Sequence, residues 1–165
     1  GILYGQQAYG LSQAINIRPK DAEAFIHTYF ERFPSVKSFL ESYKDMARES
    51  GKAVTIIGRE RAIPEINSRN PQIRAAAERL AINTPIQGSA ADLIKMAMLR
   101  VDRMLKDKKL ESYMVLQIHD ELIFEAPDLE VPELETLVKD AMENVMALRI
   151  PLEVNIAVGK NWKEC

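Results

Sequence analysis

The segment VLQIHDELIFE, residues 115 to 125, places a histidine and two adjacent acids between two runs of apolar residues that favour β-strands. Because side chains alternate between the faces of a strand, Asp120 and Glu121 cannot both be buried without a large desolvation cost. We therefore expect both acids at the tip of a hairpin, where two carboxylates in water suit Mg²⁺, a cation that prefers oxygen ligands. An ordinary solvated turn uses the same residue types, and the pattern alone leaves both interpretations open.

A second group of polar residues recurs at intervals of four in RLAINTPIQGS. We call Arg79, Asn83 and Gln87 the polar row, because they share one face of a helix if that helix continues through Pro85. Amide side chains carry donors and acceptors that suit base edges, and arginine suits phosphate or a minor-groove acceptor. A solvated helix face is the alternative. Pro85 itself predicts a kink or break, since its ring clashes with the preceding turn.

The N-terminal segment GILYGQQAYGLSQ repeats a Tyr-Gly pair. A tyrosine ring such as that of Tyr4 can stack on a nucleobase, and Gly5 permits a sharp bend or a close approach beside it. Half-buried tyrosines that only pack are the more common case. The segment is therefore a candidate nucleic-acid contact, with simple packing as the alternative.

Hydrophobic periodicity and turn residues define the elements that must position these groups. Helices are predicted over residues 19–33, 35–50, 70–106 and 132–148, the third being interrupted near Pro85. Strands are predicted over 113–118, 122–124 and 152–158, and a separate hairpin over 52–64. Ser89, followed by Asp92 three residues later, can restart the interrupted helix as a cap. This order predicts an α+β fold in which an antiparallel sheet is backed by long helices.

Length and composition limit the classes of protein to which the chain can belong. Its 165 residues, 47% of them hydrophobic, suffice for one globular domain or for a piece of a larger one. The formal net charge of −2 argues against a uniformly basic surface, but residues 59–79 hold five arginines and no lysine, which favours local contact with phosphate. No membrane-length apolar run or targeting signal is visible, and the single cysteine, Cys165, indicates a reducing, cytoplasmic location.

Three ordered motifs together resemble one family. GILYGQQAYGLSQ, RAAAERLAINTPIQGSAADLIKMAM and LQIHDELIFE closely resemble, in this order, segments of the C-terminal polymerase domain of family A DNA polymerases, the bacterial DNA polymerase I type. The resemblance extends from Gly1 to VGKNW near the end, and one departure is Gln7, where many relatives carry a smaller residue. It implies that residues 1–70 form part of a helical fingers subdomain and residues 71–165 part of the palm, whose sheet would join the acid hairpin to the C-terminal strand. The thumb and the first palm motif would be absent.

For the acid hairpin, the resemblance implies a catalytic role. Asp120 would be the metal-binding aspartate of the palm, with Glu121 beside it as an auxiliary acid and metal ligand. Gln117 and His119 would lie near the primer strand of the bound DNA.

For the preceding part of the chain, the resemblance implies contacts with DNA. Tyr4 would stack beside the template at the end of the mobile fingers helix, and Gly5 would let that helix bend. Arg74 would contact the template strand. The polar row would touch the minor-groove side of the primer–template near its growing end, where acceptors lie at similar positions in every correct base pair.

The implied reaction is template-directed DNA synthesis in replication and repair, in which a primer 3′-hydroxyl attacks a deoxynucleoside triphosphate. Two Mg²⁺ ions would support this transfer. Primer–template DNA and deoxynucleoside triphosphates would be the partners of a monomeric protein that does not bind membranes. The family's second aspartate, in an Asp-Tyr-Ser-Gln-like strand, has no counterpart here. We therefore expect a C-terminal fragment that does not polymerise alone.

Two other functions use the same residues differently. A metal-dependent phosphodiesterase would use Asp120, Glu121 and His119, but it would need further acids or histidines. A non-catalytic nucleic-acid-binding module would depend on Arg74 and Arg79 and would be indifferent to Asp120.

Overall fold

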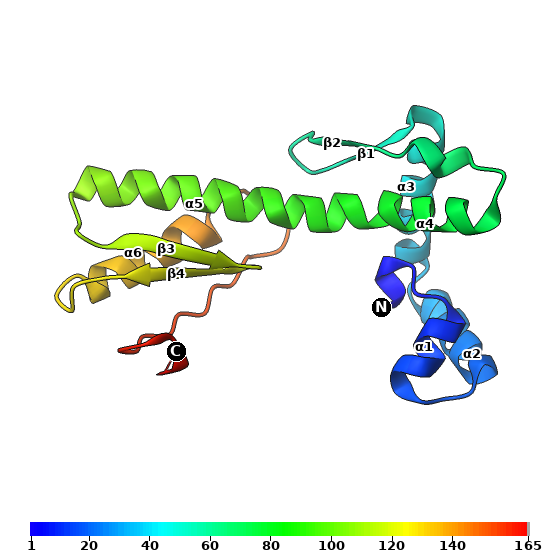
Figure 1. Cartoon of the computed structure of the whole chain (residues 1–165), viewed down its shortest axis with the longest axis horizontal. Coiled ribbons are helices and arrows are strands. Elements are labelled where there is room, and N and C mark those ends of the chain that lie inside the picture. Colours follow the sequence, from blue (N-terminus) through cyan, green and yellow to red (C-terminus); the bar gives the residue numbers. More distant parts are fainter. Residues whose placement is uncertain (165) are drawn as a thin grey trace. The chain divides into compact units, whose positions relative to one another are not determined.

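The computed structural model describes residues 1–164, so Cys165, on which the prediction of a reducing location rests, lies outside the described residues. The chain forms two compact units, one spanning Gly1–Ser89 and the other beginning at Ala90 (Figure 1). The division predicted at residue 70, between fingers and palm, concerns function rather than compactness and stays a prediction.

The first unit is mainly helical. Its helices are α1 (Ala8–Ile15), α2 (Pro19–Arg32), α3 (Pro34–Ser50) and α4 (Pro71–Asn83), and its hairpin consists of β1 (Lys52–Val54) and β2 (Glu60–Ala62). Short 3₁₀ turns span Ile2–Tyr4 and Pro64–Asn67, and a π-helical turn spans Thr84–Gly88. The helices predicted over 19–33 and 35–50 and the hairpin predicted over 52–64 are confirmed, with small differences at their ends.

Proline and asparagine fix where these helices begin. A proline occupies the first position of three of them, where its missing N–H costs nothing: Pro19, Pro34 and Pro71. The Asn70 side chain also caps α4, because its Oδ1 accepts hydrogen bonds from the amides of Gln72 and Ile73 at 2.9 and 3.4 Å. The helix that carries Arg79 and Asn83 therefore has a well-defined first turn.

A core of small and branched side chains holds α3, the first hairpin and α4 together. It consists of Ala47, Ala53, Ile63, Ile66, Ala77 and Ala81. Beside this core the Arg48 guanidinium of α3 pairs with Glu78 of α4 at 2.8 Å, and this hydrogen bond, which Arg48 donates to the Glu78 carboxylate, raises the pKa of Arg48. Apolar packing and an ion pair thus fix α4 against α3.

The second unit packs two helices against one face of a hairpin. α5 (Ser89–Lys108) begins at the last residue of the first unit, and β3 (Tyr113–Ile118), β4 (Glu121–Glu125) and α6 (Val131–Glu143) follow. The core of this unit consists of Val101, Leu105, Leu134, Leu137, Val138 and Ala141. Met114 of β3 and Phe124 of β4 pack against it. The strand predicted over 113–118 is confirmed.

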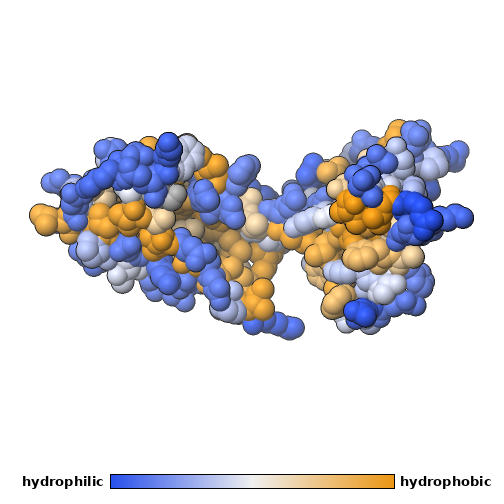
Figure 2. Space-filling view, turned by 90° about the horizontal axis from the view of Figure 1, so that it is seen from below, coloured by the Kyte–Doolittle hydropathy of each residue, from blue (hydrophilic) through white to orange (hydrophobic). Residues whose placement is uncertain are grey.

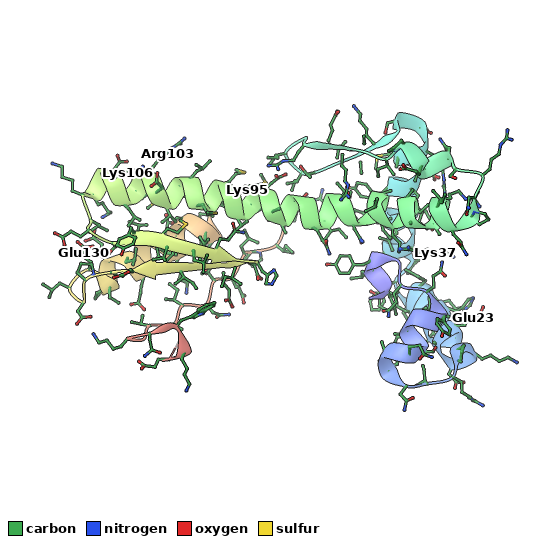
Figure 3. The ribbon with its side chains drawn as sticks, viewed as in Figure 1. Glu23, Lys37, Lys95, Arg103, Lys106 and Glu130 are labelled. Atoms are coloured by element: carbon green, nitrogen blue, oxygen red, sulfur yellow. The ribbon has the colours of Figure 1, made fainter. Side chains whose placement is uncertain are left out.

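Glu130, in the connection between β4 and α6, ties this connection to the entry of β3 (Figure 3). Its carboxylate accepts hydrogen bonds from the Ser112 hydroxyl at 2.6 Å and from the amides of Ser112 and Glu111 at 2.9 and 3.0 Å. These bonds stabilise the charged form and hold the pKa of Glu130 below its ordinary value, with the Ser112 hydroxyl contributing most.

Two predictions for the C-terminal part of the chain are wrong. The helix predicted over 132–148 ends at Glu143, and residues 152–158 do not form a strand. The Val154 amide donates to the Glu143 carboxylate at 3.0 Å instead of to a neighbouring strand, and Val158 is 57% exposed. An alternating pattern forms a strand only where its backbone has a partner. The α+β class with antiparallel hairpins is confirmed, but the described sheet next to α6 has two strands.

Large apolar side chains are exposed in both units, where Figure 2 shows apolar surface among hydrophilic residues. Tyr9 and Phe25 are examples in the first unit, and Tyr113 and Val115 in the second. Scattered residues of this kind are common on folded proteins. Among the described residues, no helix is both long enough and apolar enough to cross a membrane.

Candidate functional site

The two adjacent acids lie at the closed end of the β3–β4 hairpin. Ile118 pairs with Glu121, so His119 and Asp120 form a two-residue turn. His119 has a φ of 54°, and the Gln117 side chain closes the turn by donating from Nε2 to the His119 carbonyl at 2.8 Å. Asp120 and Glu121 are both exposed. The predicted turn position is confirmed for Asp120, whereas Glu121 is already the first residue of β4.

The hairpin contains a β-bulge in β3, and its packing shows which face carries Glu121. The register shifts between Met114 and Leu116, which leaves Val115 as an extra residue in β3. Met114 and its partner Phe124 face the helices, since both pack against the core of the unit. Successive side chains of a strand point to opposite faces, so Glu121, three residues before Phe124, lies on the face away from α5 and α6.

The other end of the hairpin carries a polar pair. The Tyr113 hydroxyl donates to Glu125 Oε2 at 2.7 Å. This hydrogen bond raises the pKa of Tyr113. Since the pair joins the first residue of β3 to the last of β4, it lies at the end of the ladder opposite to Asp120.

Asp120 and Glu121 are the predicted metal ligands, and the described residues allow this prediction to be compared with what a metal ion needs. Among residues 1–164, no group of three or more histidine, cysteine, aspartate or glutamate side chains is close enough to hold a metal ion. Mg²⁺ commonly takes one or two carboxylates from a protein and completes its coordination with water and substrate phosphates. The exposed pair of carboxylates fits that role.

The polar row follows α4 and the π-helical turn. Arg79 and Gln87 are exposed, and Asn83 is half-buried. The Asn83 Oδ1 atom is itself buried and has no hydrogen-bond partner among the described residues. The interruption predicted near Pro85 is confirmed, because α4 ends at Asn83 and a π turn follows it. The chain does not break there, since the extra residue of the π turn accommodates the proline ring and its missing N–H.

Gly5 and Arg79 meet within the first unit. Gly5 follows the first 3₁₀ turn with a φ of 77°. A Cβ atom at this position would lie 3.0 Å from Arg79 Cγ and from Ile82 Cδ1, so a glycine lets this turn approach α4 closely. Tyr4, immediately before it, is 38% exposed.

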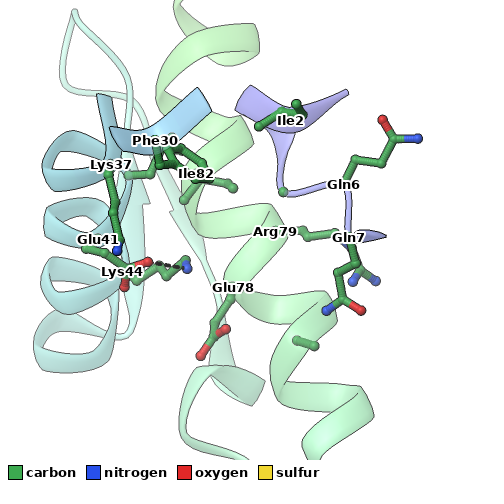
Figure 4. Close-up of a pocket in the computed structure, with 13 residues that line it drawn as sticks. Ile2, Gln6, Gln7, Phe30, Lys37, Glu41, Lys44, Glu78, Arg79 and Ile82 are labelled. Atoms are coloured by element: carbon green, nitrogen blue, oxygen red, sulfur yellow. Dashed lines mark hydrogen bonds and ion pairs between the residues drawn. The ribbon is translucent and has the colours of Figure 1, made fainter. Parts of the chain in front are cut away.

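A cleft of about 210 Å³ lies beside this contact (Figure 4). In Figure 4 the Arg79 side chain extends from α4 toward Gln7, and Lys44 pairs with Glu41 at 2.8 Å. The polar residues of the cleft are Gln6, Gln7, Lys37, Glu41, Lys44, Glu78 and Arg79. Gln6 and Gln7 belong to the N-terminal segment that the sequence marked as a candidate contact. The sequence did not identify Lys37, Glu41, Lys44 and Glu78, because the cleft joins separate segments that no motif spacing connects.

Arg74 and Arg79 are both exposed on α4 but differ in their partners. The Arg74 Nη1 atom donates to the Ser68 carbonyl at 3.1 Å. Arg79 forms no hydrogen bond or ion pair with any described residue. Of these two arginines, Arg79 is therefore the one whose guanidinium can bind a ligand without giving up a contact inside the protein.

The predicted site residues thus form two local groups. In the second unit, Gln117, His119, Asp120 and Glu121 adjoin one another at the hairpin tip. In the first unit, Tyr4 and Gly5 lie at the start of the chain and Arg74 lies on α4, which also carries the first residues of the polar row.

The chain matches known polymerases over nearly its whole length. The family model described as DNA polymerase family A matches residues 1–164. The DNA polymerase I of Bacillus subtilis (strain 168) is 51% identical over 162 residues, and that of Bacillus caldotenax is 48% identical over 162 residues. Each alignment covers 98% of this chain and 18% of the relative, so the chain spans less than a fifth of the length of these proteins.

A solved structure is similar as well. The POL domain of Pol1 from M. smegmatis, in complex with DNA primer-template and dNTP, matches with a TM-score of 0.95 and 47% identity, covering 99% of this chain and 29% of that one. The chain belongs to DNA polymerase family A. The resemblance seen in the three sequence motifs is confirmed.

Proposed function

We propose that the chain supplies the acid hairpin and part of the DNA-binding surface of a template-directed DNA polymerase that acts in replication and repair. The observation that carries the proposal is the family match over residues 1–164 together with the exposed Asp120 at a two-residue turn. The complete enzyme would be a cytoplasmic monomer that transfers a nucleotide from a deoxynucleoside triphosphate to a primer 3′-hydroxyl. Residues 1–70 would belong to its fingers and residues 71–165 to its palm.

The hairpin tip would carry the catalytic acids. Asp120 would bind Mg²⁺ through its carboxylate, and Glu121 would supply a second oxygen donor beside it. When bound, a pair of Mg²⁺ ions would favour the primer alkoxide and neutralise the pyrophosphate leaving group. The paired residues on both sides of the turn keep Asp120 in a fixed direction, which limits the reorganisation needed during the reaction. The chain alone would not polymerise, because the family's second metal-binding aspartate has no counterpart in its sequence.

The remaining candidates would hold the primer–template. Tyr4 would stack beside the template, and Gly5 would let its segment bend and approach α4. Arg74 would bind the template strand, while Gln117 and His119 would lie near the primer.

The polar row would contact the minor groove at the growing end. The free guanidinium of Arg79 and the exposed amide of Gln87 are donors that match the acceptors found there in every correct pair. These contacts would sense the geometry of a base pair without reading its sequence.

The test uses a chimera in which this chain replaces the corresponding segment of the Bacillus subtilis DNA polymerase I, to which it is 51% identical. We expect the chimera to add the nucleotide complementary to each template base in a Mg²⁺-dependent reaction, and the isolated chain to add none. A chimera that binds primer–template as its parent does but extends no primer would contradict the proposal and support a non-catalytic binding module. Cleavage of DNA without added nucleotides would support the phosphodiesterase instead.

A further inference from the structure

The π-helical turn changes the direction in which the polar row points. In an α-helix of 3.6 residues per turn, a step of four residues advances by about 40°, so Arg79 and Gln87 would point about 80° apart. A π turn holds more residues per turn and therefore rotates less with each residue. The turn at Thr84–Gly88 thus reduces the angle around the helix axis between the directions in which Arg79 and Gln87 point.

Ser89 closes this turn through its side chain. Its hydroxyl donates to the Pro85 carbonyl, which in a regular α-helix would accept from the Ser89 amide. That amide bonds to the Ile86 carbonyl instead. The Ser89 Oγ atom also accepts a hydrogen bond from the Ile56 amide at 2.8 Å. Ser89 therefore links the π turn to the loop between β1 and β2, rather than capping α5 as its sequence position predicts.

Close packing supports the same link. Thr55, at the start of the loop, is only 7% exposed. A Cβ atom at Gly88 would lie 2.7 Å from Thr55 Cγ2, so any larger residue would push the loop away from the turn. The loop after β1 thus contacts the π turn at Gly88 and at Ser89.

We propose that Ser89 is a positioning residue that sets the direction of Gln87 and thereby contributes to the discrimination between matched and mismatched primer ends. The inference rests on the proposed function, since it takes the polar row as a minor-groove contact. Ser89 is half-buried and its hydroxyl is engaged inside the protein, so it acts through Gln87 and not on DNA. Only correct pairs present their minor-groove acceptors at constant positions. A misdirected Gln87 therefore weakens the contact with a matched primer end more than the contact with a mismatched one.

Three serine variants of the chimera test this role. Ser89→Ala removes both hydrogen bonds, Ser89→Thr keeps the hydroxyl, and Ser42→Ala is the control, because the Ser42 hydroxyl donates to the Phe39 carbonyl within α3 at 2.7 Å. Single-turnover extension rates are measured on matched and mismatched primers. For Ser89→Ala we expect the matched-to-mismatched ratio to fall about fivefold, the effect of about one hydrogen bond, with primer–template affinity unchanged. Ser89→Thr and Ser42→Ala should keep the ratio of the unmodified chimera.

Hydrogen exchange supplies a readout that does not depend on activity. The Ile56 amide should exchange faster in Ser89→Ala and stay protected in Ser89→Thr and Ser42→Ala. Equal protection of Ile56 in all variants would overturn the proposed link.

Gln87→Ala separates this inference from the function on which it rests. If Gln87→Ala leaves the ratio unchanged, the minor-groove contact itself is contradicted. If Gln87→Ala lowers the ratio and Ser89→Ala does not, only the positioning role is overturned. An equal loss of extension on both primers in Ser89→Ala would indicate general damage to the fold and would likewise overturn it.

Discussion

The two groups of candidate site residues are held by different kinds of restraint. In the first unit, glycines allow segments to touch: Gly5 lies against α4 and Gly88 lies against Thr55, and a side chain at either position would collide. In the second unit, the acids stand on an open hairpin tip, which is fixed by strand pairing and by packing on its opposite face. The comparison indicates that the proposed DNA-contacting helix depends on close fit, whereas the proposed catalytic tip depends on the core beneath the hairpin.

The largest change in the free energy of unfolding, relative to a control variant, is expected in the core of the second unit. Leu137 of α6 is 3% exposed and belongs to the cluster against which the hairpin packs. Leu137→Ala should lower the free energy of unfolding by about 2–5 kcal/mol, through lost burial and the cavity that remains. Leu129→Ala is the control, since Leu129 is 96% exposed. Urea unfolding of the purified chain measures both, and similar losses in the two variants would contradict the dependence of the hairpin on this core.

A smaller difference between the variant and its control is expected at the close contact of the first unit. Gly5→Ala introduces a Cβ at 3.0 Å from two side chains of α4, at a φ of 77°. Gly51→Ala is the matched control, because Gly51 has a φ of 71° but no atom within 4 Å of the added Cβ. Both variants should lose about 1–2 kcal/mol through the left-handed backbone.

Overpacking should cost Gly5→Ala a further amount of about 1–3 kcal/mol. The difference between the two unfolding free energies therefore isolates the contact with α4. Equal losses would show that this close approach contributes nothing to stability.

The smallest effect concerns the hydrogen bonds of Glu130. Because the pKa of Glu130 lies below its ordinary value of 4.5 in the folded chain, its contribution to stability is present above that value and is lost as the pH falls through the folded pKa. Glu130→Gln should therefore reduce the fall in unfolding free energy between neutral and acidic pH. Glu135→Gln, at a residue without hydrogen bonds or ion pairs to the described chain, should keep the original pH dependence. An unchanged dependence in Glu130→Gln would contradict the role of these bonds.

Local sequence signals predicted the elements that are complete within a short segment. Pro19 and Pro71 mark where helices begin, and the apolar runs around Asp120 predicted β3 and the turn after it. Asp120, Glu121 and the polar row were identified as candidates by residue type and spacing alone. Their assignment to one family needed the resemblance of whole motifs.

The features that were not predicted have a common physical cause, because each depends on a partner distant in sequence. Residues 152–158 alternate like a strand, but the Val154 amide bonds to Glu143 and no strand lies beside it in the described chain. Pro85 predicted an interruption of the helix by a kink or break, and the interruption takes the form of a π turn that Ser89 and the loop after β1 support. Neither contact can be recognised from the spacing of residues along one segment.

Single-turnover primer extension by the chimera with Asp120→Asn tests the proposed catalytic role of the hairpin most directly. Glu125→Gln is the control, an exposed acid of the same hairpin at the opposite end of the ladder. We expect Asp120→Asn to slow extension by about a thousandfold or more while primer–template affinity is retained, and Glu125→Gln to extend nearly as fast as the unmodified chimera. Nearly equal rates for Asp120→Asn and the unmodified chimera would contradict the role of Asp120 as the metal-binding acid.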